Sequence, residues 1–129
     1  MRPFETRQLP SSYDALAPDG SEIRLLHGLD GASVVHCRLP VGTVSSPVQH
    51  RTVEEVWVIL AGAGEVWRRQ GQREETVAVA PGMSLTIPLG TQFQFRALGD
   101  APLEFLITTS PPWPGADEAV LLDAGHWKT

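Results

Sequence analysis

Apolar residues along this chain come in short bursts of about four to eight, separated by glycine, proline and aspartate. No stretch keeps the longer period of an amphipathic helix. Bursts rich in Val, Ile, Leu and Phe with this punctuation are typical of β-strands. The pattern predicts strands at residues 21–26, 32–39, 54–60, 64–69, 75–79, 84–87, 92–96 and 103–108. We therefore expect an all-β protein.

Glycines mark the turns between these strands. Gly62-Ala63-Gly64 predicts a tight hairpin between the third and fourth strands, and Gln70-Gly71-Gln72 predicts a turn before the fifth. Glycine suits both places because it adopts positive φ without steric cost. Strands at this even spacing indicate a β-sandwich or a small barrel of the jelly-roll kind.

The two ends of the chain differ from the middle because they are irregular and rich in proline. A length of 129 residues favours one domain. We expect a core barrel at about residues 21–109, an N-terminal arm at 1–20 and a C-terminal tail at 110–129. Trp113 and Trp127 are large anchors, so the tail is expected to lie across the barrel or across a partner subunit.

Charge and composition exclude several partners. The formal net charge is −5, and the basic residues form no stripe that follows a phosphate backbone, so we expect no nucleic acid. No apolar run approaches the roughly 20 residues that cross a bilayer, so we expect no membrane partner. The first residues lack the apolar stretch of a signal peptide, and the single cysteine excludes an intramolecular disulfide. Cytoplasmic residence is the default expectation.

Two spaced patterns in the middle of the chain are more specific than its composition. They read Gly42-x5-Val48-x-His50-x4-Glu55-x6-Gly62 and Gly82-x5-Pro88-x-Gly90-x2-Phe93-x3-Ala97. Every glycine and proline in them resembles the two signature motifs of the cupin superfamily, and the resemblance covers residues 32–108. The chain looks like a small single-domain bacterial cupin of undefined activity. The resemblance implies a jelly-roll β-barrel, a homodimer, and a site inside the barrel mouth.

In metal-binding cupins the resemblance implies four ligand positions, which here read Val48, His50, Glu55 and Phe93. Valine and phenylalanine cannot coordinate a metal, and two protein ligands rarely hold a divalent ion against water. We therefore expect no cofactor. The alternative is a metal-dependent enzyme of the dioxygenase or decarboxylase type. In that case His50 and Glu55 bind a divalent transition metal with help from Gln92, solvent or substrate.

His50 and Glu55 are also the candidate catalytic residues. The functional hypothesis is that they face each other in the barrel mouth, with His50 as general acid or base and Glu55 as its orienter. Among the cupins, sugar-nucleotide epimerases and polyketide cyclases are a fold-level precedent for proton transfer. The structural alternative is a remnant pair, hydrogen-bonded to one another because an unpaired buried charge is costly.

Alternation along the strands predicts the rest of the pocket. If Glu55 points inward, Trp57 and Ile59 share its face, and an inward Phe93 brings Phe95 and Ala97 with it. The candidate substrate-binding residues are Val48, Trp57, Gln92, Phe93 and Phe95. Such a lining suits a flat or apolar small molecule, whereas the alternative is that these aromatic residues only fill the barrel.

Other histidines and the cysteine carry less weight. His36 and Arg38 share one face of their strand and Cys37 takes the other, which we assign to the core as an inert thiol. His27 is expected in a turn and His126 in the solvated tail. The first functional hypothesis is a small-molecule-binding cupin, of the isomerase or cyclase type if it is catalytic. The others are the metal-dependent enzyme and a non-catalytic ligand-sensing module.

Overall fold

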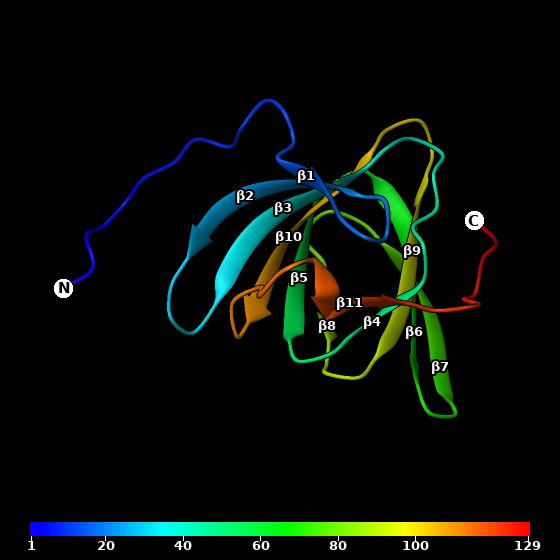
Figure 1. The fold of residues 1–129 in the computed structure, drawn as a ribbon. Coiled ribbons are helices and arrows are strands. Elements are labelled where there is room, and N and C mark those ends of the chain that lie inside the picture. The colour runs from blue at the N-terminus through cyan, green and yellow to red at the C-terminus, as the bar shows by residue number, and fades with distance from the viewer.

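The computed structural model describes residues 1–129 and is all-β, as the hydrophobic pattern predicts (Figure 1). Its strands are β1 (Ala15–Leu16), β2 (Glu22–Gly28), β3 (Ser33–Leu39), β4 (Val48–His50), β5 (Glu54–Ala61), β6 (Ala63–Gln70), β7 (Arg73–Val79), β8 (Ser84–Ile87), β9 (Gln92–Leu98), β10 (Leu103–Ser110) and β11 (Ala119–Leu121). One short 3-10 helix, η1 (Ala116–Glu118), precedes β11. The structure contains no helix that is long and apolar enough to span a bilayer.

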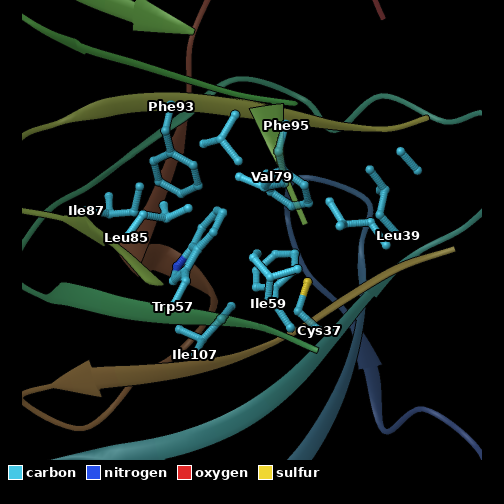
Figure 2. Close-up of a cluster of buried hydrophobic side chains, with 14 of the residues drawn as sticks. Cys37, Leu39, Trp57, Ile59, Val79, Leu85, Ile87, Phe93, Phe95 and Ile107 are labelled. Carbon is cyan, nitrogen blue, oxygen red and sulfur yellow. The ribbon is translucent and has the colours of Figure 1, made fainter. Parts of the chain in front are cut away.

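The strands form two antiparallel sheets. The six-stranded sheet has the order β1-β2-β3-β10-β5-β8, and the five-stranded sheet has the order β11-β4-β9-β6-β7. Apolar side chains from both sheets pack between them, among them Trp57 and Ile59 from β5 and Phe93 and Phe95 from β9 (Figure 2). Along β5 buried and exposed residues alternate strictly, as expected of a strand with one face on the core.

The predicted strands all exist, and their observed ends differ by at most two residues. Three strands were missed, β1, β4 and β11, because two or three residues are too few to display an alternation. The prediction that His27 lies in a turn is wrong, since β2 continues to Gly28. Of the three missed strands β4 matters most, because it carries His50, which is paired with Ala119 of β11.

The predicted hairpin at Gly62 is also wrong. β5 and β6 do not pair with each other, because β5 lies in the six-stranded sheet and β6 in the five-stranded sheet. Gly62 has a φ of 81°, and a Cβ at this position would lie 2.1 Å from the carbonyl oxygen of Pro102. The glycine is therefore needed where the chain crosses between sheets. The turn at Gly71 is confirmed, since Gln70 pairs with Arg73 across it.

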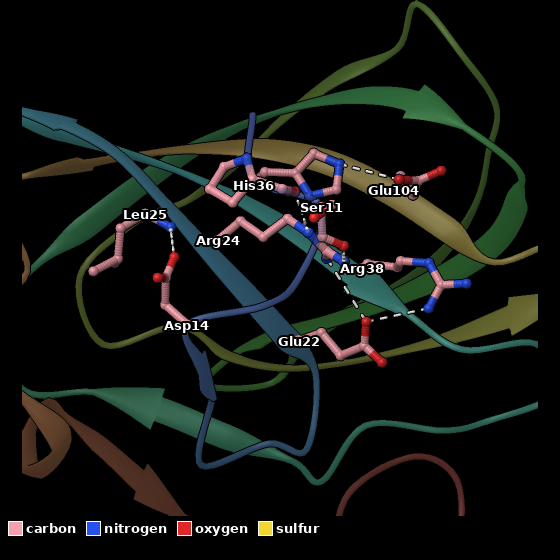
Figure 3. A network of polar contacts seen from close by, with 9 residues as sticks. Ser11, Asp14, Glu22, Arg24, Leu25, His36, Arg38 and Glu104 are labelled. Atoms are coloured by element: carbon pink, nitrogen blue, oxygen red, sulfur yellow. Dashed lines mark hydrogen bonds and ion pairs between the residues drawn. The ribbon is translucent and has the colours of Figure 1, made fainter. Parts of the chain in front are cut away.

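The N-terminal arm covers part of the outer face of the six-stranded sheet (Figure 3). The guanidinium of Arg24 donates to the carbonyl oxygens of Pro10 and Ser11, at 3.0 and 3.2 Å. Beneath this segment His36 is only 3% exposed although it points away from the core. Cys37 faces the core as predicted, and burial raises the pKa of its thiol. The thiol is therefore an inert part of the core.

The C-terminal tail crosses the five-stranded sheet (Figure 1). The fully buried amide of Gln94 holds it, donating to the carbonyl oxygen of Trp127 at 2.8 Å and accepting the backbone N–H of His126 at 2.9 Å. The guanidinium of Arg96 lies 4.6 Å from the centre of the Trp127 ring. A Cβ at Gly125 would lie 2.5 Å from Gln94 Oε1, so the tail approaches the sheet closely there.

The outward face of β5 is unusually apolar. Val56, Val58 and Leu60 are 46%, 40% and 45% exposed where an uncovered sheet face ordinarily carries polar residues. The homodimer expected from the family resemblance stays a prediction, and light scattering of the purified protein tests it.

Candidate functional site

A cavity of about 600 Å³ lies between the two sheets and is closed in part by both terminal segments. Most of the predicted site residues line it: Val48, His50, Glu55, Trp57, Phe93 and Phe95. The exception is Gln92, which lies beside Phe93 on β9 and therefore points to the opposite face of the sheet. The prediction that Gln92 helps to bind a substrate or a metal thus places it on the wrong face.

Glu55 is held inside this cavity by two hydrogen-bond donors. Its Oε1 accepts the indole N–H of Trp57 at 3.0 Å, and its Oε2 accepts the hydroxyl of Thr109 at 3.1 Å. Thr109 is within reach because the two residues are paired across β5 and β10. Burial raises the pKa of Glu55 to about 7, although the hydrogen bonds from Trp57 and Thr109 oppose this rise. Near neutral pH this carboxyl is therefore partly protonated.

His50 enters the cavity from β4 and has no polar partner there. It is 6% exposed, and its Nδ1 is buried without a hydrogen bond. Its ring packs edge to face against Phe93 and Trp113, with centroids 5.2 and 5.3 Å apart. Burial lowers the pKa of His50 to about 4, against the opposing charge of Glu118. The imidazole is therefore neutral near neutral pH.

The expectation that His50 and Glu55 bond to each other is wrong. Both carboxylate oxygens of Glu55 are engaged by Trp57 and Thr109, and Nδ1 of His50 has no partner at all. The two residues are separate polar groups in one apolar chamber. Neither the remnant pair nor the oriented imidazole of the sequence hypotheses describes them.

Glu118 of η1 fixes the turn that follows His50. Its carboxylate, 4% exposed, accepts the backbone N–H groups of Thr52 and Val53 at 2.6 and 3.1 Å and also the Thr52 hydroxyl. Burial alone would raise the pKa of Glu118, but these hydrogen bonds together lower it. This role of Glu118 could not be predicted from the sequence, because Glu118 lies 66 residues beyond Thr52.

Asp19 is a cavity residue that the sequence did not predict. Pro18-Asp19-Gly20 reads as an ordinary turn. In the structure Asp19 lines the cavity, and its Oδ1 accepts both the backbone N–H and the hydroxyl of Ser21, at 2.9 and 2.6 Å. Burial raises the pKa of Asp19 in spite of these two hydrogen bonds. No pattern in the sequence distinguishes this aspartate from a solvated turn residue.

The side chains around the cavity do not fit a transition metal. No three His, Cys, Asp or Glu side chains come together in an arrangement able to hold a metal ion. Val48 and Phe93 are buried at two of the four positions that carry ligands in metal-binding cupins. His50 and Glu55 alone are too few ligands for a transition metal, and the Glu55 carboxylate already accepts hydrogen bonds from Trp57 and Thr109.

Comparison with known sequences defines the class of this protein. The cupin domain model matches residues 35–109, so the chain belongs to the cupin family. The uncharacterized protein MJ1618 of Methanocaldococcus jannaschii is 31% identical over 123 residues, covering 88% of this chain and 94% of that protein. The xanthan biosynthesis protein XanB of Xanthomonas campestris is 29% identical over 90 residues, which cover 70% of this chain but only 18% of that protein.

Solved structures agree with this assignment at the level of the fold. KdgF from Halomonas superposes with a TM-score of 0.65 at 21% identity, covering 78% of this chain and 87% of that one. Oxalate decarboxylase superposes with a TM-score of 0.70 at 14% identity, covering 79% of this chain and 28% of that one. At these identities the likeness shows a shared jelly-roll fold and nothing about the reaction.

Proposed function

We propose that this cupin binds a small carbonyl compound in its cavity and isomerises it by proton transfer, with Glu55 as the base and His50 as the donor to the carbonyl oxygen. One observation carries the proposal. A buried carboxyl held by two donors and a buried histidine with an unpartnered nitrogen line the same apolar chamber. The proposal reverses the roles that the sequence hypothesis gave to these two residues.

The environment of Glu55 supports its role as a base. A carboxyl with a pKa of about 7 is matched to proton transfer near neutral pH. Trp57 and Thr109 each occupy one oxygen, which fixes the plane of the carboxylate and leaves it further lone pairs for a substrate proton.

The environment of His50 supports its role as a neutral donor. A buried polar atom without a partner costs about 1–3 kcal/mol, so Nδ1 is expected to bond to something that enters the cavity. With its pKa lowered to about 4, the ring stays uncharged and offers one N–H. Triosephosphate isomerase uses a neutral imidazole and a glutamate base in the same division of labour.

The proposed reaction balances without any further reagent. In a carbonyl compound with a C=C bond between its β and γ carbons, Glu55 takes a proton from the α carbon, and the C–H electrons form a dienolate whose oxygen accepts the N–H of His50. The protonated Glu55 then returns the proton to the γ carbon, so the double bond moves to lie between the α and β carbons, which gives the conjugated isomer. Apolar side chains line the chamber around the enolate and reduce its contact with water: Ile23, Val35, Phe95 and Ile107.

Deuterium exchange tests the proposal without knowledge of the natural substrate. The protein is incubated in D₂O with two neutral ketones, flat 1-indanone and extended 2-decanone, and deuterium uptake beside the carbonyl is followed by mass spectrometry. We expect catalysed uptake that rises with pH and levels off above about 7, because only the ionised form of Glu55 accepts a proton. Glu55→Gln is expected to abolish it, while Glu75→Gln at an exposed position leaves it unchanged.

The other hypotheses predict different outcomes. Ketone binding without exchange contradicts the catalytic step and favours a non-catalytic ligand-sensing module. Stoichiometric metal in untagged protein, lost in His50→Ala, favours the metal-dependent enzyme instead. If neither ketone binds, the proposal is wrong. Cytoplasmic location also stays a prediction, which fractionation of the source cells tests.

A further inference from the structure

The ionisable groups that line the cavity are unbalanced in charge. They are Arg7, Asp19, His27, His50 and Glu55. Arg7 is the only permanent cation among them, and it is an exposed residue of the N-terminal arm. Its guanidinium already donates to the carbonyl oxygen of Leu25 at 3.1 Å. Apart from Arg7 and the two histidines, the ionisable groups of the cavity are two acids, Asp19 and Glu55.

Asp19 is the acid that has no role in the proposed reaction. Both of its hydrogen bonds come from Ser21 and both reach Oδ1, so neither donor engages Oδ2. No lysine, arginine or histidine forms an ion pair with Asp19, whereas Glu22 and Glu104 outside the cavity both have such partners. In its ionised form an unpaired carboxylate in an apolar chamber disfavours a second negative charge nearby, because Coulomb repulsion adds to the cost of desolvation.

We propose that Asp19 makes the cavity selective against anions, so that its ligand is an uncharged carbonyl compound and not a carboxylate or a phosphate ester. The inference rests on the proposed function, because it concerns the ligand of the same cavity. It assigns Asp19 a part in specificity and none in the proton transfer.

Three probes of equal chain length separate the possibilities. Binding of 2-decanone, decanoate and decylamine is measured by calorimetry at about pH 8, where decanoate is an anion and decylamine a cation. We expect the ketone to bind at least about tenfold more tightly than decanoate. This comparison uses the unaltered protein, so it does not depend on the folding of any variant.

Asp19→Asn then tests the residue itself. An asparagine side-chain oxygen still accepts the two Ser21 donors, so the turn is expected to keep its shape. The variant is expected to bind decanoate about five- to tenfold more tightly and 2-decanone within about twofold of the unaltered protein. Asp100→Asn, in the exposed turn between β9 and β10, is the matched control and is expected to change neither affinity.

Each remaining outcome has a definite meaning. If decanoate binds as tightly as the ketone, or if Asp19→Asn leaves the ratio of the two affinities unchanged, the inference about Asp19 is wrong and the proposed function stands. If decylamine binds most tightly, the inference is overturned in favour of an ammonium site. If no probe binds, the inference and the proposed function both fail.

Discussion

Two buried histidines lie on opposite sides of the six-stranded sheet, and both leave Nδ1 without a hydrogen bond, but only His36 has an ion-pair partner at its other nitrogen. His36 is 3% exposed on the outer face, where its Nε2 lies 3.2 Å from a carboxylate oxygen of Glu104 under the N-terminal arm. His50 is 6% exposed in the cavity and touches the aromatic rings of Phe93 and Trp113. Burial and an unpartnered Nδ1 are thus weak signs of function by themselves, because both histidines have them. His50 is distinguished by lining the cavity and by having no ion-pair partner.

The electrostatic surroundings of the two histidines sharpen the difference. Burial lowers the pKa of His36, Glu104 opposes this, and Arg24 and Arg38 lower the pKa further. This is a charge network within the protein that engages Nε2 of His36 and leaves its Nδ1 without a partner (Figure 3). His50 has no such network, and its only opposing charge is that of Glu118. We infer that His36 stabilises the attachment of the arm and that His50 serves a ligand.

The largest expected effect is on the pH dependence of stability. The folded-state pKa of Glu55 is raised from 4.5 to about 7, so the folded state binds more protons between these values and stability falls as pH rises through them. The loss amounts to about 3 kcal/mol. His50 acts in the opposite direction between pH 4 and 6.5, so the two effects partly cancel in the unaltered protein.

Glu55→Gln isolates this contribution. Urea unfolding across this range is expected to show the variant gaining about 3 kcal/mol relative to the unaltered protein from pH 4.5 to above 7. Glu75→Gln, whose side chain is 52% exposed in the original residue, is the control and is expected to show no such gain. A constant difference at all pH values contradicts the raised pKa of Glu55.

Replacing His50 is expected to separate function from stability. His50→Phe removes the proposed donor to the carbonyl oxygen and is expected to slow ketone exchange by about 100-fold. It also removes an unpartnered buried nitrogen, so the free energy of unfolding is expected to stay within about 1 kcal/mol of the original. Equal exchange rates in the variant and the original protein contradict the role assigned to His50.

Replacing His36 is expected to lower stability and to leave ketone exchange nearly unchanged. His36→Leu removes the buried imidazole that pairs with the partly exposed carboxylate of Glu104, and is expected to lower the free energy of unfolding by about 1 kcal/mol. Ketone exchange, measured on the folded variant, is expected to stay within about twofold. A large loss of exchange with unchanged stability would mean that His36 on the outer face takes part in the reaction, which contradicts its structural role.

The smallest expected effect is on the pKa of His50. Glu118→Gln keeps an acceptor for the N–H groups of Thr52 and Val53 but removes the negative charge that opposes the lowering of the His50 pKa. The pKa of His50, followed by NMR titration, is therefore expected to fall below its value in the unaltered protein. A rise in this pKa means that Glu118 does not act on His50 through its charge.

The sequence predicted those features of the fold and the site that depend on residues close together along the chain. Alternation placed Trp57 and Ile59 with Glu55 on one face of β5, and the glycine and proline frame indicated the jelly roll. The same reasoning failed for Gln92, because membership of a motif was given more weight than the alternation that turns it away from Phe93.

Features that depend on distant residues were beyond the sequence. Thr109, a donor to Glu55, lies 54 residues further along the chain. Asp19 enters the cavity from a turn that has no distinguishing pattern, and the burial of His36 depends on how the N-terminal arm packs. These contacts follow from the three-dimensional path of the chain and leave no local periodicity to recognise.

We propose that the unpartnered nitrogen of His50 bonds to a ligand in the cavity. The most direct test is long-range ¹H–¹⁵N NMR of ¹⁵N-labelled protein titrated with 2-decanone, with the ring nitrogens of His36 and His50 followed together. We expect the His50 signals to move in a saturable way while those of His36 stay fixed. Saturable binding that leaves the His50 ring unmoved, or that moves only His36, would contradict it.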